Sequence, residues 1–139
     1  MGCGEWGVDD ANLIWNRACD TSHQPSRPGD AALQEVILFH SLSMNGGIAH
    51  ALEVDFARSA RVVGHYRFFG AEDHASLIEE ARSLAAPGVA ADGTFDSLAL
   101  NDEQAEELDA LDARLPDDSD LEAMFRAYLD AHPEAFDPP

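Results

Sequence analysis

The chain has 139 residues, of which 27 are acidic and 8 are basic, all of them arginine, so its formal net charge is −19 at pH 7. Hydrophobic residues make up 45% of the chain, which is enough for the core of one domain and excludes extended disorder. Because basic residues supply most of the affinity for phosphate, this balance argues against direct binding to nucleic acid or to an anionic membrane, and it favours a basic protein partner.

The N-terminal part is predicted to contain one helix followed by a long buried helix. Asp9 or Asp10 caps the first helix, and the proline-rich stretch after it predicts a loop over 21–29. Asp30 caps the next helix, predicted over 31–44, which carries apolar side chains on more than one side. We therefore expect it to be the central, most buried helix of the fold.

A glycine pair is predicted to end this helix at a tight corner. Asn45, Gly46 and Gly47 follow the apolar run, and glycine accepts the left-handed backbone that a helix end favours. Three more helices, the last two separated by Gly70, are predicted over 48–56, 58–69 and 72–86.

The C-terminal part is predicted to contain a long loop and two helices. Residues 87–101 are rich in alanine and glycine and predict a flexible loop. Asn101 with Gln104 predicts a capping box before a helix over 102–115, and Ser119 with Glu122 predicts another before a helix over 121–131. Since no segment alternates like a strand, the chain is predicted to be a single all-α domain over 1–139, a bundle of about six to eight helices.

The histidines are the main hint of catalytic chemistry. His50 and Glu53 share a helix face, but a di-iron bundle repeats Glu-x-x-His twice, and the sequence lacks that repeat. His40 lies in an apolar run and is expected in the core. The histidines near helix ends or loops are expected to be solvated: His23, His74 and His132. A metal-dependent enzyme that uses His50 and Glu53 is therefore the least favoured alternative.

The two cysteines and the N-terminus give little sign of other functions. Cys3 and Cys19 are too few for a disulfide framework or a zinc cluster, and Cys19 is more simply a small residue at a helix end than a thiolate partner of His23. No stretch approaches the ~20 apolar residues of a membrane helix, and the N-terminus lacks the pattern of a secretory signal. We predict a cytoplasmic protein without catalytic residues, cofactor or metal site.

Acidic residues are concentrated in the second half of the chain. Residues 1–70 hold 8 acids and 5 Arg, a net charge of −3, whereas residues 71–139 hold 19 acids and 3 Arg, a net charge of −16. A surface adapted to high salt would carry its acids evenly, so the split argues against that alternative. A solvated face without a partner and a weak surface for divalent cations stay open, although the sequence has no calcium-binding loop.

The densest acidic segment is the helix predicted over 102–115. Its apolar stripe consists of Ala105, Leu108, Leu111 and Leu115, so the carboxylates between positions 102 and 112 are expected to face water. At a rise of about 1.5 Å per residue they give roughly one negative charge per 2.5–3 Å, while duplex DNA carries one per about 1.7 Å. The two charge densities are of the same order.

Several segments resemble the small DNA-mimic protein domain family of acidic bacterial proteins. The apolar run Glu35-Val36-Ile37-Leu38-Phe39-His40 precedes Met44-Asn45-Gly46-Gly47-Ile48-Ala49-His50-Ala51-Leu52, which is similar to the family's Asn-Gly-Gly core motif. Phe69-Gly70-Ala71-Glu72 is similar to its Gly-Ala step between two helices, and 121–136 to its closing helix and Pro-Phe finish. The resemblance covers most of 9–136. Ile48 and Ala49 depart from it, since the family commonly has aromatic residues there.

The resemblance implies an all-α fold and, for the characterised member, an acidic dimer whose carboxylates imitate duplex phosphates on the DNA-binding face of a helix-turn-helix transcription factor. We therefore predict a non-enzymatic protein, with a homodimer as one expected state, that binds a basic DNA-binding protein. The predicted contacts are Asp102, Glu103, Glu106, Glu107, Asp109, Asp112, Asp117, Asp118 and Asp120, with a second strip of Glu72, Asp73, Glu79 and Glu80. An immunity or antitoxin-like inhibitor of a basic nuclease is the alternative, and charge alone does not separate the two. Both predict binding that weakens steeply with salt.

Overall fold

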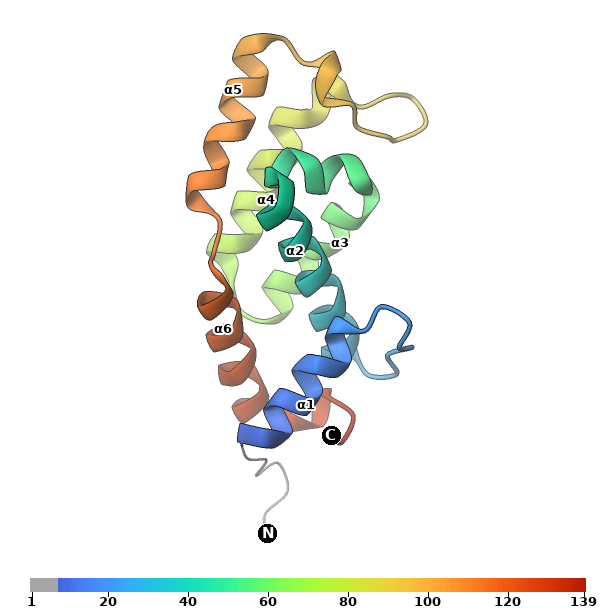
Figure 1. Cartoon of the computed structure of the whole chain (residues 1–139), viewed down its shortest axis with the longest axis vertical. Helices are drawn as coiled ribbons and strands as arrows, with labels where there is room; N and C mark the ends of the chain where they lie inside the picture. The colour runs from blue at the N-terminus through green and yellow to red at the C-terminus, as the bar shows by residue number, and fades with distance from the viewer. Residues whose placement is uncertain (1–7) are drawn as a thin grey trace.

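The computed structural model describes residues 8–139 and consists of α-helices joined by turns and short 3₁₀ segments (Figure 1). The helices are α1 (Val8–Cys19), α2 (Pro28–Val54), α3 (Phe56–Phe68), α4 (Glu72–Ala85), α5 (Asp102–Ala110) and α6 (Asp118–Ala131). The described residues form no strand beyond an isolated bridge between Val89 and Phe95. The predicted all-α fold with six to eight helices is therefore confirmed.

Helix α2 is the centre of the bundle, as its apolar surface predicts. It packs against α1, α3, α4 and α5, and it buries Leu33, Val36 and Phe39 in its first part. Its second part continues the core with Ile48 and Leu52, which are also fully enclosed. A helix that contacts neighbours on several sides has to be apolar on several sides, which explains its sequence.

A single glycine bends α2 at the predicted corner. Gly47 has φ 86° and ψ 169°, a backbone conformation that is open essentially only to glycine, and the helix resumes on its far side. The backbone N–H of Ile48, exposed by this break, donates to Oδ1 of Asp112 at 2.8 Å. A Cβ atom on residue 47 would lie 2.8 Å from the other oxygen of the same carboxylate. Residue 47 therefore couples α2 to the segment that follows α5.

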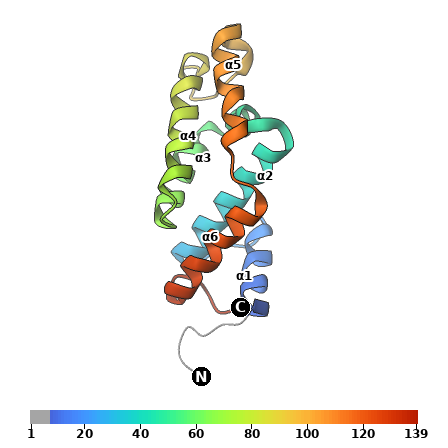
Figure 2. The ribbon, with the colours of Figure 1, turned by 90° about the vertical axis from the view of Figure 1, so that its left-hand side faces the viewer.

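Helices α5 and α6 follow one another along one long side of the molecule. Figure 2, which turns that side toward the viewer, shows both helices in front, with α4 to one side of them and α1 and α2 to the other. The 3₁₀ segment Leu111–Arg114 joins the two helices. The most acidic part of the sequence is therefore carried by a continuous edge of the bundle.

Several predicted helix boundaries are wrong. Helix α1 is already helical at Val8, so neither Asp9 nor Asp10 is its N-cap, and α2 begins at Pro28. Asp30 is consequently not a cap but a buried residue, whose carboxylate accepts from Arg17 and from the backbone of Asp137, both at 2.7 Å. Helix propensity indicates roughly where the helices lie, but it does not reveal these contacts of Asp30. Both partners, Arg17 and Asp137, lie outside α2 and reach Asp30 only in the folded chain.

The second half shows three further differences from the prediction. The helix predicted over 102–115 is α-helical only to Ala110, and the second capping box consists of Asp117 and Asp120 rather than Ser119 and Glu122. The predicted loop contains two 3₁₀ segments, and it buries Phe95. A capping box needs two side chains with acceptor oxygens three positions apart, and several overlapping pairs in this segment meet that requirement.

Two of the histidines expected to be solvated are partly buried. His23 is half-buried and its Nε2 atom is enclosed without a hydrogen-bond partner, whereas His74 packs edge-on against Tyr66, with 5.4 Å between ring centroids. His132 is exposed, and His40 is buried as predicted. A position near a helix end therefore does not by itself predict that a histidine is exposed, because neighbouring segments can pack over it.

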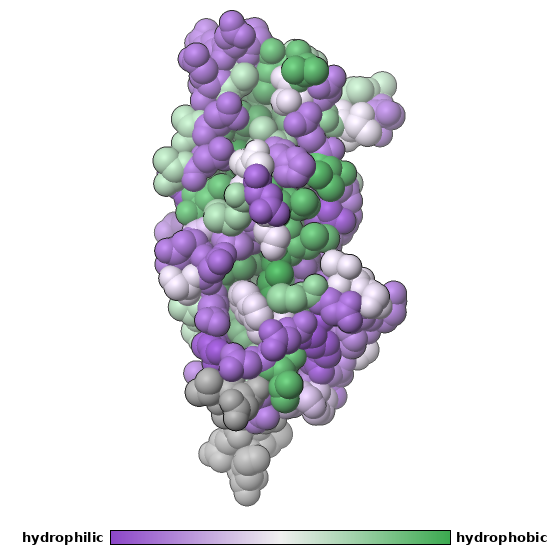
Figure 3. Space-filling view, viewed as in Figure 1, coloured by the Kyte–Doolittle hydropathy of each residue, from purple (hydrophilic) through white to green (hydrophobic). Residues whose placement is uncertain are grey.

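The visible surface alternates between hydrophilic and apolar regions. In Figure 3 hydrophilic residues gather at the upper left, at the α5 end of the molecule, and apolar residues show beside them and around the middle of the same face. Among the described residues, no helix combines the length and the apolar character needed to cross a membrane. Cys3 lies outside the described residues.

Candidate partner-binding surface

Helix α5 is a short acidic helix that is fixed at its start and along one stripe. The Asn101 side chain accepts from the backbone of Gln104 at 2.8 Å, and the Gln104 side chain accepts from the backbone of Asn101 at 2.9 Å, which completes the predicted capping box. Leu108 and, just beyond the helix, Leu111 are buried, and α5 packs against α4 and α2. These contacts orient the helix and leave its remaining surface to solvent.

Five carboxylates of α5 face solvent without a partner in residues 8–139. All five are exposed, and none makes a hydrogen bond or an ion pair with any described residue: Asp102, Glu103, Glu106, Glu107 and Asp109. Residues three or four positions apart on a helix have Cβ atoms about 5–6 Å apart, so these groups form a band of like charges along the helix. None of the arginines in residues 8–139 forms an ion pair with this band.

Three carboxylates that follow α5 accept hydrogen bonds from backbone N–H groups at helix starts. Asp112 caps the second part of α2 through Ile48, as described above. Asp117 and Asp120 cap α6 reciprocally, with hydrogen bonds of 2.8 Å and 3.1 Å. The hydrogen bond from the Ser119 hydroxyl, followed by that from the Asp120 backbone, lowers the pKa of Asp117 below its usual value. These three carboxylates therefore already have structural roles in the free protein.

Asp118 joins the first turn of α6 to α2. Its Oδ1 atom lies 2.7 Å from Nε2 of His40, whose side chain is only 6% exposed whereas that of Asp118 is 90% exposed. The pair lies in a surface hollow that Ser41, Met44 and Asn45 also line. Together with Asp112, this contact holds the α5–α6 edge against the central helix.

The predicted second strip is largely neutralised by arginine. Glu72 and Glu79 both bind Arg67, at 3.1 Å and 2.5 Å, and Glu80 binds Arg114 at 3.0 Å. The hydrogen bonds from Arg67 lower the pKa of Glu72. Of this strip, only Asp73 makes no ion pair with a described residue, and it is exposed. Sequence reasoning missed Arg67, because the turn at Gly70, with φ 79°, brings it back beside α4.

The residues of the metal-enzyme alternative do not converge on one site. His50 is exposed, and Glu53 accepts a hydrogen bond from the backbone of Ser97 at 3.2 Å. Within residues 8–139 no three histidine, cysteine, aspartate or glutamate side chains are grouped closely enough to hold a metal ion. Cys19 is a free, exposed thiol whose pKa is raised by partial burial.

Comparison with known proteins gives one match. The family model described as DMP19-like protein matches residues 26–132, which is well over half of the chain and includes α2 to α6. No curated protein and no solved structure matches the chain. The matched region contains the bent central helix and the whole acidic edge.

Proposed function

The chain belongs to the family of DMP19-like proteins, and we propose that it is a non-enzymatic DNA mimic that binds the DNA-binding face of a basic protein. DMP19 is a DNA-mimic protein family, so membership supports the mimic activity in general. The proposal for this chain is more specific: α5 is the centre of the contact surface. Its carboxylates would take the place of phosphates and would meet arginine or lysine side chains of the partner.

The observation that carries this proposal is the contrast between α5 and α4, whose three glutamates all bind arginine. Five exposed carboxylates within one short helix have no basic partner among the described residues, although the chain contains 8 arginines. Like charges at this spacing destabilise a helix, and an evenly mixed surface would avoid them. A cationic partner would relieve the repulsion on binding, so part of the binding free energy is already stored in the free protein.

The structure supports a division of the predicted contact residues into two classes. The five α5 carboxylates are proposed as the phosphate surrogates. Asp112, Asp117, Asp118 and Asp120 are proposed to orient the acidic edge through their caps and their contact with His40. A charge that is held on a rigid helix costs less to order on binding than one on a mobile side chain or loop.

Two triple variants with the same change in net charge test the proposal. The first is Glu106→Gln, Glu107→Gln and Asp109→Asn in α5. The matched control is Glu122→Gln, Glu134→Gln and Asp130→Asn, which neutralises two glutamates and one aspartate in or just after α6. Purified helix-turn-helix repressors, each bound to its fluorescent operator duplex, serve as probes in a competition measured by fluorescence anisotropy.

The wild-type protein is expected to displace the duplex from at least one repressor, with an affinity that falls steeply as the salt concentration rises. The α5 variant is expected to bind about tenfold more weakly at low salt, since each exposed charge pair contributes up to about 1 kcal/mol. The control variant is expected to stay within about twofold of wild type. An equal loss in both variants would show that net charge alone acts, and salt-independent binding would contradict the electrostatic mechanism altogether.

A further inference from the structure

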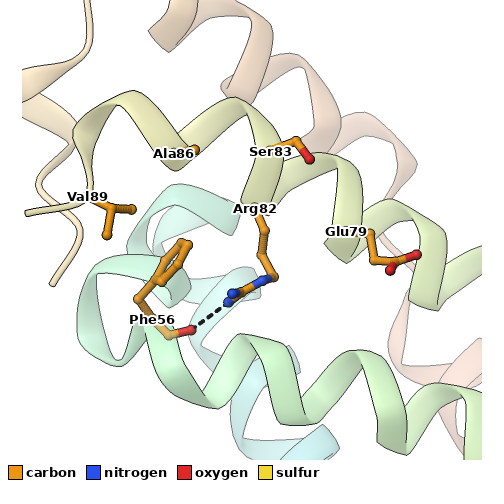
Figure 4. A pocket seen from close by; sticks show the side chains of 6 residues that line it. All are labelled: Phe56, Glu79, Arg82, Ser83, Ala86 and Val89. Atoms are coloured by element: carbon orange, nitrogen blue, oxygen red, sulfur yellow. Dashed lines mark hydrogen bonds between the residues drawn. The ribbon is translucent and has the colours of Figure 1, made fainter. Parts of the chain in front are cut away.

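A cavity that is widely open to solvent lies between α3 and α4 and contains an arginine with unused hydrogen-bonding capacity. The cavity has a volume of about 610 Å³ and is lined by Phe56, Glu79, Arg82, Ser83, Ala86 and Val89. Figure 4 shows Arg82 reaching from α4 toward Phe56 at the start of α3. The volume lies within the range of about 300–1,000 Å³ that is typical of small-molecule sites.

Arg82 differs from every other arginine of the chain. All eight arginines lie in the part of the chain that the structure describes, and seven of them have a carboxylate oxygen within 4.0 Å: Arg17, Arg27, Arg58, Arg61, Arg67, Arg114 and Arg126. Arg82 has none there, in a protein with 27 acidic residues. A half-buried arginine in so acidic a chain, with no carboxylate partner in residues 8–139, points to a ligand that supplies the counter-charge.

The contacts of Arg82 fix one edge of its guanidinium and leave the other open. Its Nη1 atom donates to the backbone oxygen of Phe56 at 2.9 Å and to the hydroxyl of Ser59 at 2.5 Å. Its Cζ atom lies 4.3 Å from the centroid of the Phe56 ring. The Nε and Nη2 atoms donate to no acceptor in residues 8–139, and neither belongs to the buried polar atoms without a partner. This edge has the geometry that binds a carboxylate through two parallel hydrogen bonds.

The charge around the cavity suits a ligand with one negative charge. Glu79 also lines the cavity, but its carboxylate binds Arg67, at 2.5 Å, and in Figure 4 it points away from Arg82. Phe56, Ala86 and Val89 supply an apolar wall beside the guanidinium. A second negative charge on the ligand would approach Glu79 and would have no cation of its own.

We propose that this cavity binds a small organic monocarboxylate with a flat apolar body. The carboxylate accepts from Nε and Nη2 of Arg82, and the apolar body lies against Phe56 and Val89. No residue of α5 lines the cavity, so this site is independent of the proposed binding of a basic protein. The pinned guanidinium is pre-organised for the ligand, because Phe56 and Ser59 already hold it in place.

Phenylacetate is the probe, and phenylacetamide, which has the same shape without the charge, is the matched control ligand. Each is titrated into the full chain labelled with nitrogen-15, and the Nε–H signals of the arginines are followed by NMR. Phenylacetate is expected to shift the Arg82 signal saturably, with a Kd on the order of 1 mM, together with backbone signals near Phe56 and Val89. Phenylacetamide is expected to bind at least tenfold more weakly.

Two substitutions in the cavity, with one control outside it, separate binding at the site from effects on the surrounding structure. Arg82→Gln is expected to weaken phenylacetate binding at least tenfold, while Arg114→Gln, which removes an arginine from outside the cavity, leaves it unchanged. Because Arg82→Gln also loses two hydrogen bonds to α3, Ala86→Glu provides a second test: it keeps these bonds and places a competing carboxylate at an exposed lining position. A linear, non-saturating shift, equal binding of phenylacetamide, or full affinity in both cavity variants would overturn the proposal.

Discussion

Asp30 and Glu35 of α2 and the carboxylates of α5 have opposite relations to the fold. Asp30 is 3% exposed and is bound by Arg17, and Glu35 is bound by Arg58, Arg61 and His65. The carboxylates of α5 are exposed and have no such partner among the described residues. Both helices bury apolar side chains against the core, many in α2 and Leu108 in α5, and what separates these carboxylates is the placement of arginine.

This contrast separates acids that stabilise the fold from acids that are free to bind. A paired carboxylate contributes to stability only in its charged form and with its partner in place. An unpaired carboxylate in a band of like charges costs stability, and its charge remains available to a partner. Substitution in the two helices should therefore change stability in opposite directions.

The largest effect is expected at Asp30. Asp30→Ala leaves the Arg17 guanidinium without its counter-charge beside the core and leaves the backbone N–H of Asp137 without its acceptor. Breaking a buried pair by removing one partner costs about 3–5 kcal/mol, and the partial exposure of Arg17 places this site near 3 kcal/mol. Urea unfolding, followed by tryptophan fluorescence, measures the loss.

Asp130→Ala is the matched control for that experiment, because Asp130 is an exposed aspartate of α6. It is expected to change the free energy of unfolding by no more than about 0.5 kcal/mol. A loss of less than about 1 kcal/mol in Asp30→Ala would mean that the ion pair with Arg17 contributes little to stability. It would contradict the conclusion that the paired acids of α2 stabilise the fold.

A smaller and pH-dependent effect is expected at Glu35. The hydrogen bonds from Arg61, assisted by His65, hold its pKa below the usual value, while partial burial acts in the opposite direction. The carboxylate therefore stabilises the fold above its unfolded pKa of about 4.3, and this stabilisation is lost as the pH falls through its lower folded pKa. Glu35→Gln should be less stable than wild type by about 1 kcal/mol at pH 7.

In urea unfolding at a series of pH values, the difference between Glu35→Gln and wild type is expected to shrink as the pH falls below the unfolded pKa of about 4.3 and to be lost once the pH lies below the lowered folded pKa. The variant Asp130→Asn should instead run parallel to wild type across that range. A constant difference for Glu35→Gln at all pH values would mean that the side chain acts through packing rather than through its charge.

The helices and the bend could be predicted from the sequence, but most of the contacts between charged side chains could not. Apolar periodicity locates the helices, and glycine marks the bend at Gly47, because both signals are local. Arg17 with Asp30, His40 with Asp118 and Ile48 with Asp112 join positions that are 13, 78 and 64 residues apart. Such contacts depend on how the helices pack, and no local pattern specifies them.

The same reason explains which candidate carboxylates are exposed without an ion pair among the described residues and which are paired with arginine. The α5 carboxylates were predicted to face water from their spacing against Leu108 and Leu111, and a local spacing is sufficient for that conclusion. The carboxylates of α4 have the same local appearance. They differ only because Arg67 and Arg114 approach from neighbouring segments, which a single sequence does not reveal.

The smallest effect is expected in α5, and it has the opposite sign. The variant Glu106→Gln, Glu107→Gln and Asp109→Asn removes like charges from a helix whose last turn has no basic residue to balance the helix dipole. Its melting temperature should therefore rise by about 2–4 °C at low salt. Calorimetry at low salt and at about 0.5 M salt measures the change, and added salt should reduce it by screening the repulsion in wild type.

The control variant of α6 should not gain stability, because Glu122 lies 3.9 Å from Arg126 and Glu134 lies 3.5 Å from His132. A fall in the melting temperature of the α5 variant would show that these carboxylates have partners that stabilise the free protein, which would contradict their assignment as unpaired. Measuring both stability and binding for the α5 variant tests the comparison between the two helices most directly. If the α5 substitutions raise stability while they weaken binding to a basic protein, the repulsion within α5 is maintained for binding and not for folding.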